Sequence, residues 1–257
     1  MMFKTAAALA ALAFGMASTA QAATLVGLTA DNKLVKIDTA TLAASPATAI
    51  TGTDKVIGID VRPADGTLWG LTASGQLVTI EPSGKATAGS MLSEKVALGE
   101  RPVVDFNPVA DRLRVIAANG VSLRINVETG ATTVDKPLNF DTADAAKDKK
   151  PAVLAGAYTN STKGAKTTEL FHVEGGTGAL VLQSPPNDGV LKTRGMVGVA
   201  NMADAAIDID NESEGKNTAY MVTGGTLYTI DLASGKATSV GAIKSLSGKL
   251  VDIAVWK

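Results

Sequence analysis

The sequence predicts an all-β protein, a β-propeller of five blades with four antiparallel strands in each blade. Two observations lead to this fold. One pattern of four short strands recurs along the chain, and the two ends of the chain each carry part of a further copy. Propellers repeat a four-stranded sheet around an axis at intervals of about 40–50 residues. The length fits a single unit, because all-β domains of about 200–250 residues are ordinary.

The clearest copy of the pattern spans residues 57–87. Its apolar runs are separated by the turn sequences ADG (64–66), SG (74–75) and PSG (82–84), as in a series of short hairpins. Related patterns recur at 103–133, 153–194 and 206–240, and the copy at 153–194 is the most divergent. A single small sheet cannot bury both of its faces, so the copies are expected to pack on one another.

The two ends of the chain complete a fifth blade. Residues 250–256 (LVDIAVW) resemble a first strand alone, and residues 25–49 resemble the second, third and fourth strands. Pairing the C-terminal strand with the N-terminal hairpin closes the ring and removes an exposed sheet edge. We therefore predict one propeller domain over residues 23–257. Its long connections, 90–100 and 139–150, are expected on the face that binds ligands, because function tends to lie on loops, but polar loops of this kind are more often merely solvated.

The N-terminal segment has the features of a cleaved secretory signal over residues 1–22. Lys4 supplies the positive charge, residues 6–17 are apolar, and the AQA sequence at 20–22 is a cleavage site that leaves Ala23 first. An uncleaved anchor is the alternative. The apolar run is short for a bilayer, and no other stretch is long enough to cross one. These features predict a protein that does not span the membrane, in the bacterial periplasm or outside the cell.

Composition excludes several kinds of chemistry. The formal charge of −1 gives no electrostatic reason to expect nucleic acid as a partner. Cysteine is absent, which excludes disulfides, thiolate catalysis and zinc sites built on cysteine. The single histidine, His172, excludes metal sites with several histidines. His172 lies in a predicted strand, where a histidine is more often exposed or hydrogen-bonded than catalytic, and no Gly-x-Ser-x-Gly turn accompanies it.

Aspartates recur at matching places in the predicted first strands. They are Asp60, Asp105, Asp208 and Asp252, and the first strand of the fourth blade, at 154–158, has none. First strands line the channel of a propeller, so the four acids could form a ring that binds a hard cation such as Ca²⁺. The structural alternative is that each carboxylate accepts hydrogen bonds from backbone N–H groups of a neighbouring turn. The spacing alone leaves both hypotheses open.

Two further motifs are explained by turn chemistry. Arg62 and Arg112 lie beside proline-containing turns, and turn formation accounts for all the residues there. The alternative is an anion site, which would require the two arginines to converge. Residues 185–189 (PPNDG) resemble a hairpin loop stiffened by proline, although a protein-docking loop is the alternative.

Several of these motifs together resemble an uncharacterised bacterial group, the domain-of-unknown-function family numbered 4394. They are GID-x-RPA-x-G at 58–66, DFNPVADR at 105–112, AYTN at 157–160 and LVLQSPPNDG at 180–189. The resemblance covers nearly the whole chain after residue 22 and implies a secreted or envelope-associated protein with a propeller-like fold. It implies no activity. Members often adjoin membrane anchors or sorting tails, and the absence of one before Lys257 favours a soluble product.

Two functions remain open from the sequence. The first is a non-enzymatic scaffold that binds an unidentified protein or small molecule through its loops. The second is a Ca²⁺-dependent hydrolase of the lactonase type, in which Asp60, Asp105, Asp208 and Asp252 hold the metal and the metal activates a carbonyl or water. The sequence assigns no catalytic residue and no cofactor other than this possible Ca²⁺. It favours the non-enzymatic scaffold.

Overall fold

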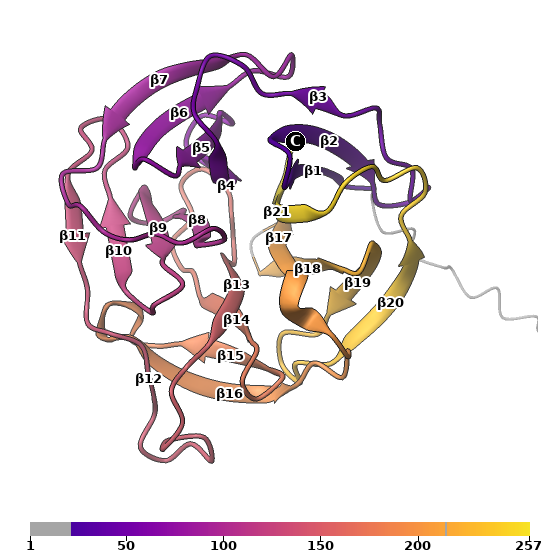
Figure 1. Cartoon of the computed structure of the whole chain (residues 1–257). Helices are drawn as coiled ribbons and strands as arrows, with labels where there is room; N and C mark the ends of the chain where they lie inside the picture. The colour runs from indigo at the N-terminus through magenta and orange to yellow at the C-terminus, as the bar shows by residue number, and fades with distance from the viewer. Residues whose placement is uncertain (1–21, 214) are drawn as a thin grey trace, which may run out of the picture.

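A computed structural model describes residues 22–213 and 215–257 and confirms the predicted five-bladed propeller. Five small sheets stand around a central axis, with their first strands innermost (Figure 1). The predicted signal segment lies outside the described residues apart from Ala22. Among the described residues, no helix is long and apolar enough to cross a bilayer.

The blades follow one another in chain order, and successive strands of a blade lie farther from the axis, except that blade 1 takes its innermost strand from the C-terminal end and blade 4 gains an outer strand from the preceding connection. Blade 1 combines β21 (Leu250–Val255) with β1 (Thr24–Thr29), β2 (Lys33–Asp38) and β3 (Thr48–Ala49). Blade 2 contains β4 (Val56–Val61), β5 (Leu68–Thr72), β6 (Gln76–Ile80) and β7 (Ala86–Met91). Blade 3 contains β8 (Val103–Asn107), β9 (Arg112–Ile116), β10 (Ser122–Ile125) and β11 (Thr132–Val134).

Blade 4 contains β13 (Val153–Tyr158), β14 (Leu170–Glu174), β15 (Ala179–Gln183) and β16 (Val190–Met196). The short strand β12 (Asn139–Phe140) adds to it, pairing in parallel with β16. Blade 5 contains β17 (Ala206–Ser213), β18 (Lys216–Thr223), β19 (Thr226–Ile230) and β20 (Ala237–Ala242). Two single-turn 3₁₀ helices, η1 (Pro186–Asp188) and η2 (Met202–Asp204), lie in connections.

The ring closes as the ends of the sequence predict. Strand β21 pairs antiparallel with β1, from Leu25 opposite Val255 to Thr29 opposite Leu250. The predicted strand at 250–256 ends one residue earlier, at Val255. The C-terminal strand thus supplies the innermost strand of the blade that the N-terminal hairpin begins, and no first strand is left without a partner.

Apolar side chains between neighbouring blades form the core. One cluster joins blades 2 and 3 through residues such as Leu71, Phe106 and Leu123, each without exposed surface. Inner strands approach one another closely, and a Cβ added at Gly58 of β4 would lie 2.3 Å from Cγ2 of Val104 in β8. Because all five inner strands run in the same direction, residues at their carboxyl ends gather on one face around the axis.

Candidate functional site

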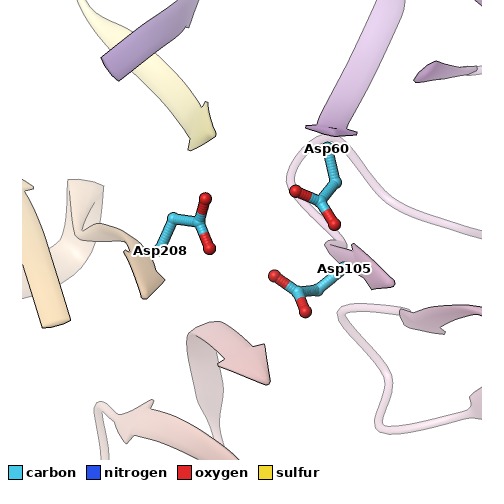
Figure 2. Close-up of side chains that lie close together, drawn as sticks. All are labelled: Asp60, Asp105 and Asp208. Carbon is cyan, nitrogen blue, oxygen red and sulfur yellow. The ribbon is translucent and has the colours of Figure 1, made fainter. Parts of the chain in front are cut away.

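Three inner strands bring their aspartates together at the axis. Asp60 on β4, Asp105 on β8 and Asp208 on β17 each offer one carboxylate oxygen, and these oxygens lie within 4.8 Å of one another. All three residues are buried. Figure 2 shows Asp60 and Asp105 from adjacent blades facing Asp208 across the channel. We call these three residues the carboxylate cluster.

Each acid of the cluster also accepts a hydrogen bond from the backbone of the next blade. Oδ2 of Asp60 accepts from the N–H of Phe106 at 2.6 Å. Oδ1 of Asp105 accepts from the N–H of Tyr158 at 2.9 Å. These bonds join blades 2, 3 and 4, so the two carboxylates hold neighbouring inner strands in register while they line the channel.

The same bond recurs at two further seams. Oδ2 of Asp208 accepts from the N–H of Val255 at 2.5 Å, which joins blade 5 to blade 1. Oδ2 of Asp252 accepts from the N–H of Ile59 at 2.9 Å, which joins blade 1 to blade 2. The structural hypothesis from the sequence therefore describes these aspartates correctly, except that the donors belong to adjacent inner strands rather than to turns.

Asp252 is not among the acids whose oxygens converge, although its charge is close enough to raise the pKa of Asp60 and of Asp105. Burial raises the pKa of Asp252 well above its usual value, the backbone N–H groups of Ile59 and Ile253 oppose the rise, and the nearby guanidinium of Arg101 opposes it to a smaller extent. Arg101 donates to the carbonyl oxygens of Ala203 at 2.7 Å, Ala205 at 2.8 Å and Val251 at 3.2 Å. Its side chain thus crosses the end of the channel where inner strands begin. The four predicted ligands divide into three that converge and one that does not.

The environment of the cluster disfavours three bare negative charges. Burial is the main cause that raises the pKa of Asp60 and of Asp105 well above the usual value, and neighbouring carboxylates raise both further. Burial also raises the pKa of Asp208 to about 6, although backbone N–H groups of Val255 and Ile209 oppose the rise. A cation between the three groups would remove this repulsion and favour their ionised forms.

A pocket of about 150 Å³ opens onto the cluster from the face where inner strands end. We call it the axial pocket. Its lining includes the acids Asp60, Asp208 and Asp210, the loop residues Ser161 and Thr162, and the cations Arg62 and Lys257. The long connections lead to the starts of inner strands, on the other face. The pocket therefore opens opposite to the face that the long connections suggest for ligands.

The two cations that line the pocket, Arg62 and Lys257, both form ion pairs with acids. Arg62 bonds Asp111 through Nε at 2.9 Å and Nη2 at 2.6 Å, and its Nη1 lies 2.6 Å from Glu128. Arg112 does not join it, because its Nη1 donates to the carbonyl oxygen of Asp111 and it is absent from the pocket lining. The two arginines therefore do not converge on an anion.

His172 lies away from the axial pocket, inside the sheet of blade 4. It has no exposed surface, and its Nε2 is 2.7 Å from Oε1 of Gln183. Burial lowers its pKa to about 4, so the imidazole is neutral at physiological pH. It is a hydrogen-bonded residue of the sheet, as its place in a strand suggested.

Sequence reasoning missed Asp210, Lys257 and Arg101. Asp210 had a signal, because it follows Asp208 by two residues and alternate residues of a strand share a face. Lys257 and Arg101 had none, since each lies outside a regular element and only the closed ring places it at the channel. The loop residues Ser161 and Thr162 reach the pocket for the same reason.

The cluster can coordinate a hard cation. Calcium takes six to eight oxygen ligands at about 2.3–2.6 Å, so oxygens on opposite sides of one ion lie about 5 Å apart. Oδ2 of Asp105 accepts no hydrogen bond from any described residue, although the side chain is 3% exposed. A carboxylate oxygen without a protein donor keeps its lone pairs available for a cation or for water.

A larger hollow of about 770 Å³ lies between blades 4 and 5, but the cluster does not line it. Its residues are mainly threonines and apolar side chains, together with the pair Glu169 and Arg194 at 3.8 Å. We therefore take the axial pocket as the candidate site.

The fold and the channel acids define this protein as a five-bladed propeller with an acidic axial pocket. The model of the domain of unknown function DUF4394 matches residues 33–254. The chain belongs to this family, as the sequence motifs suggested. No curated protein matches the chain.

Solved structures match the chain at low sequence identity. A structural genomics protein of unknown function from Bacteroides thetaiotaomicron is 14% identical, with a TM-score of 0.54. The match covers 93% of this chain and 66% of that one, so the chain spans just under two thirds of that protein. A protein of unknown function from Bacteroides caccae is 13% identical, with a TM-score of 0.43 over 92% of this chain and 99% of that one.

Proposed function

We propose that this protein is a non-enzymatic binding scaffold whose axial pocket binds a divalent cation, with Ca²⁺ as the best fit. The observation that carries the proposal is the convergence of Asp60, Asp105 and Asp208 within 4.8 Å. Carboxylate oxygens are the ligands that calcium prefers. Backbone N–H groups already fix the orientation of the three side chains, so binding needs little reorganisation.

The charge around the pocket supports a positively charged ligand. Asp60 and Asp208 of the cluster line the pocket together with Asp210, and Asp105 is not part of the lining. Of the two cations, Arg62 is compensated by Asp111 and Glu128. With the carboxylates ionised, the pocket has an excess of negative charge, which raises the local concentration of cations.

The predicted secretory segment indicates what affinity for Ca²⁺ to expect. We place the protein in the bacterial periplasm or the extracellular space, where Ca²⁺-binding modules have dissociation constants of about 10⁻⁴–10⁻³ M. Fractionation of cells that express the full chain tests this location, and N-terminal sequencing of the secreted product tests for Ala23 as the first residue. A product that stays in the cytoplasm with its N-terminus intact would contradict it.

Thermal unfolding tests the cation site. The chain from residue 23 is melted in a chelator and then with 5 mM CaCl₂. A ligand that binds only the folded state stabilises it by about 2 kcal/mol at roughly 50 times its dissociation constant. For a domain of this size that amounts to a rise of about 5 °C in Tm.

Two variants make this test specific. Asp105→Asn keeps an acceptor for the N–H of Tyr158 but removes a charged ligand, and it should abolish the response to CaCl₂. Asp252→Asn is the matched control, since Asp252 makes the same kind of inter-blade bond outside the cluster, and it should keep the response. Equal responses in both variants, or no response in the wild type, would refute the site.

A Ca²⁺-dependent hydrolase is the second candidate, favoured by one observation. The axial pocket opens directly onto Asp60 and Asp208 and has room for a small molecule beside a bound ion. A metal with an open position could polarise a carbonyl or activate water. Hydrolysis of simple lactones and aryl esters, measured with CaCl₂ and with chelator, tests this candidate. Turnover that Asp105→Asn eliminates would support it over the scaffold.

A further inference from the structure

The side chain of Lys257 lies over the axial pocket. Its Nζ is 2.8 Å from Oδ1 of Asp210, and it donates to the carbonyl oxygen of Asn211. The lysine side chain is 57% exposed, whereas the side chain of Asp210 is 9% exposed. A mobile cation therefore faces a fixed and buried carboxylate at the entrance to the site.

Asp210 is poorly satisfied in this arrangement. Its Oδ1 is buried and accepts no hydrogen bond, so the contact with Lys257 is an ion pair without hydrogen-bond geometry. Asp210 also follows Asp208 by two residues on β17 and lines the same pocket. This buried carboxylate, paired with Lys257, therefore lies in the pocket that Asp60 and Asp208 also line.

We infer that the ammonium group of Lys257 is a tethered competitor for the cation site, which a divalent cation displaces from Asp210 on binding. This inference rests on the proposed function and adds a determinant of its affinity. The resident ammonium neutralises part of the negative charge that attracts the cation. Once Lys257 has moved, the charge of Asp210 is no longer neutralised and adds to the attraction of the pocket for the cation.

The energetics permit this exchange. Ion pairs with one exposed partner are weak, because water and salt screen the charge and the long side chain loses rotamer freedom. Lysine carries its charge on a flexible stem, so the ammonium can leave without movement of the backbone. A divalent ion carries twice the charge and can contact several carboxylates at once, which favours it over the lysine.

A purely structural role for Lys257 makes a different prediction. In that case the lysine joins β21 to β17 through Asp210 and Asn211, and its removal lowers stability without tightening cation binding. Calcium affinity therefore separates the two roles, and thermal stability alone does not.

Isothermal titration with CaCl₂ on the chain from residue 23 tests the inference. Lys257→Met keeps the aliphatic stem and removes the charge, and we expect it to bind Ca²⁺ about three- to fivefold more tightly than the wild type. Lys85→Met is the matched control, since this exposed lysine lies in the outer turn of blade 2, and it should leave the affinity unchanged. Thermal melts in chelator confirm that each variant is folded.

The Asp210→Asn background completes the test. Without this carboxylate Lys257 has no charge to mask, so adding Lys257→Met should give no gain in affinity. Wild type and Lys257→Met that bind Ca²⁺ equally, or weaker binding by Lys257→Met, would overturn the role of the lysine and leave the proposed function intact. Absence of binding in every variant would overturn both.

Discussion

At the scale of single residues, each channel aspartate has two relationships, one with a neighbouring backbone and one with the other acids. In Asp252 the first is the closer one, since it bonds the N–H of Ile59 and its oxygens lie outside the cluster. Asp105 shows both, because one oxygen holds Tyr158 and the other has no donor among the described residues. The bond to the backbone stabilises the fold, and the free oxygen makes a ligand site chemically reasonable.

Buried His172 gives the protein a predictable sensitivity to acid. Its pKa is lowered to about 4 in the folded chain, against about 6.5 in the unfolded chain, so the unfolded state binds the extra proton as the pH falls between these values. The stability that neutral His172 preserves at pH 7 is lost on acidification, by about 2 kcal/mol at pH 4.5.

Urea unfolding at pH 7 and pH 4.5 measures this loss. In His172→Gln the unfolding free energy should fall by about 2 kcal/mol less over the same interval, because no imidazole remains to titrate. Comparing the two proteins removes the contributions of the channel acids, which are common to both. An identical pH dependence in wild type and variant would contradict the low pKa.

At the scale of elements, the packing of inner strands depends on the absence of a side chain at Gly58. A Cβ there would lie 2.3 Å from Cγ2 of Val104 on the adjacent blade. Gly58→Ala should lower the unfolding free energy by about 1–3 kcal/mol, as overpacking does in close-packed interiors. Chemical denaturation measures the loss.

A second substitution shows whether the contact is responsible. Val104→Ala removes the methyl groups that the new Cβ would meet, so the double variant should be more stable than the sum of the two single changes predicts. If the losses of unfolding free energy in the two single variants simply add, the strain in Gly58→Ala does not come from its contact with Val104.

The elements could be predicted because turns and apolar runs are local signals. Sequences such as ADG at 64–66 mark strand ends, and the partial copies at the two termini imply ring closure. The sequence could not predict that three of the four aspartates converge and Asp252 does not, because this depends on where along the channel each inner strand lies. Asp252 and Asp208 occupy similar places in their repeats, yet only Asp208 reaches the cluster.

At the scale of the whole molecule, stability depends on closure by β21. This strand pairs with β1, and its Val255 and Asp252 bond acids or backbone of the blades on both sides. Deletion of residues 250–257 should remove cooperative unfolding and leave an exposed edge on β1 that favours association. Calorimetry and sedimentation velocity measure both effects. A truncated chain that stays monomeric, with a Tm within a few degrees of the full chain, would refute this dependence.

The divergence of one copy has a consequence for the symmetry of the channel. A perfect fivefold repeat would place five acids in a ring of equal charges around the axis, with no preferred side. Here β13 contributes no acid and Asp252 lies near Arg101, so the rotational symmetry of the backbone is not shared by the charge. Three carboxylates remain, too few to enclose a calcium ion, whose coordination shell would then be completed by molecules from outside the protein. The imperfection of the repeat thus gives the channel an uneven distribution of charge around its axis, which a symmetric ring would lack.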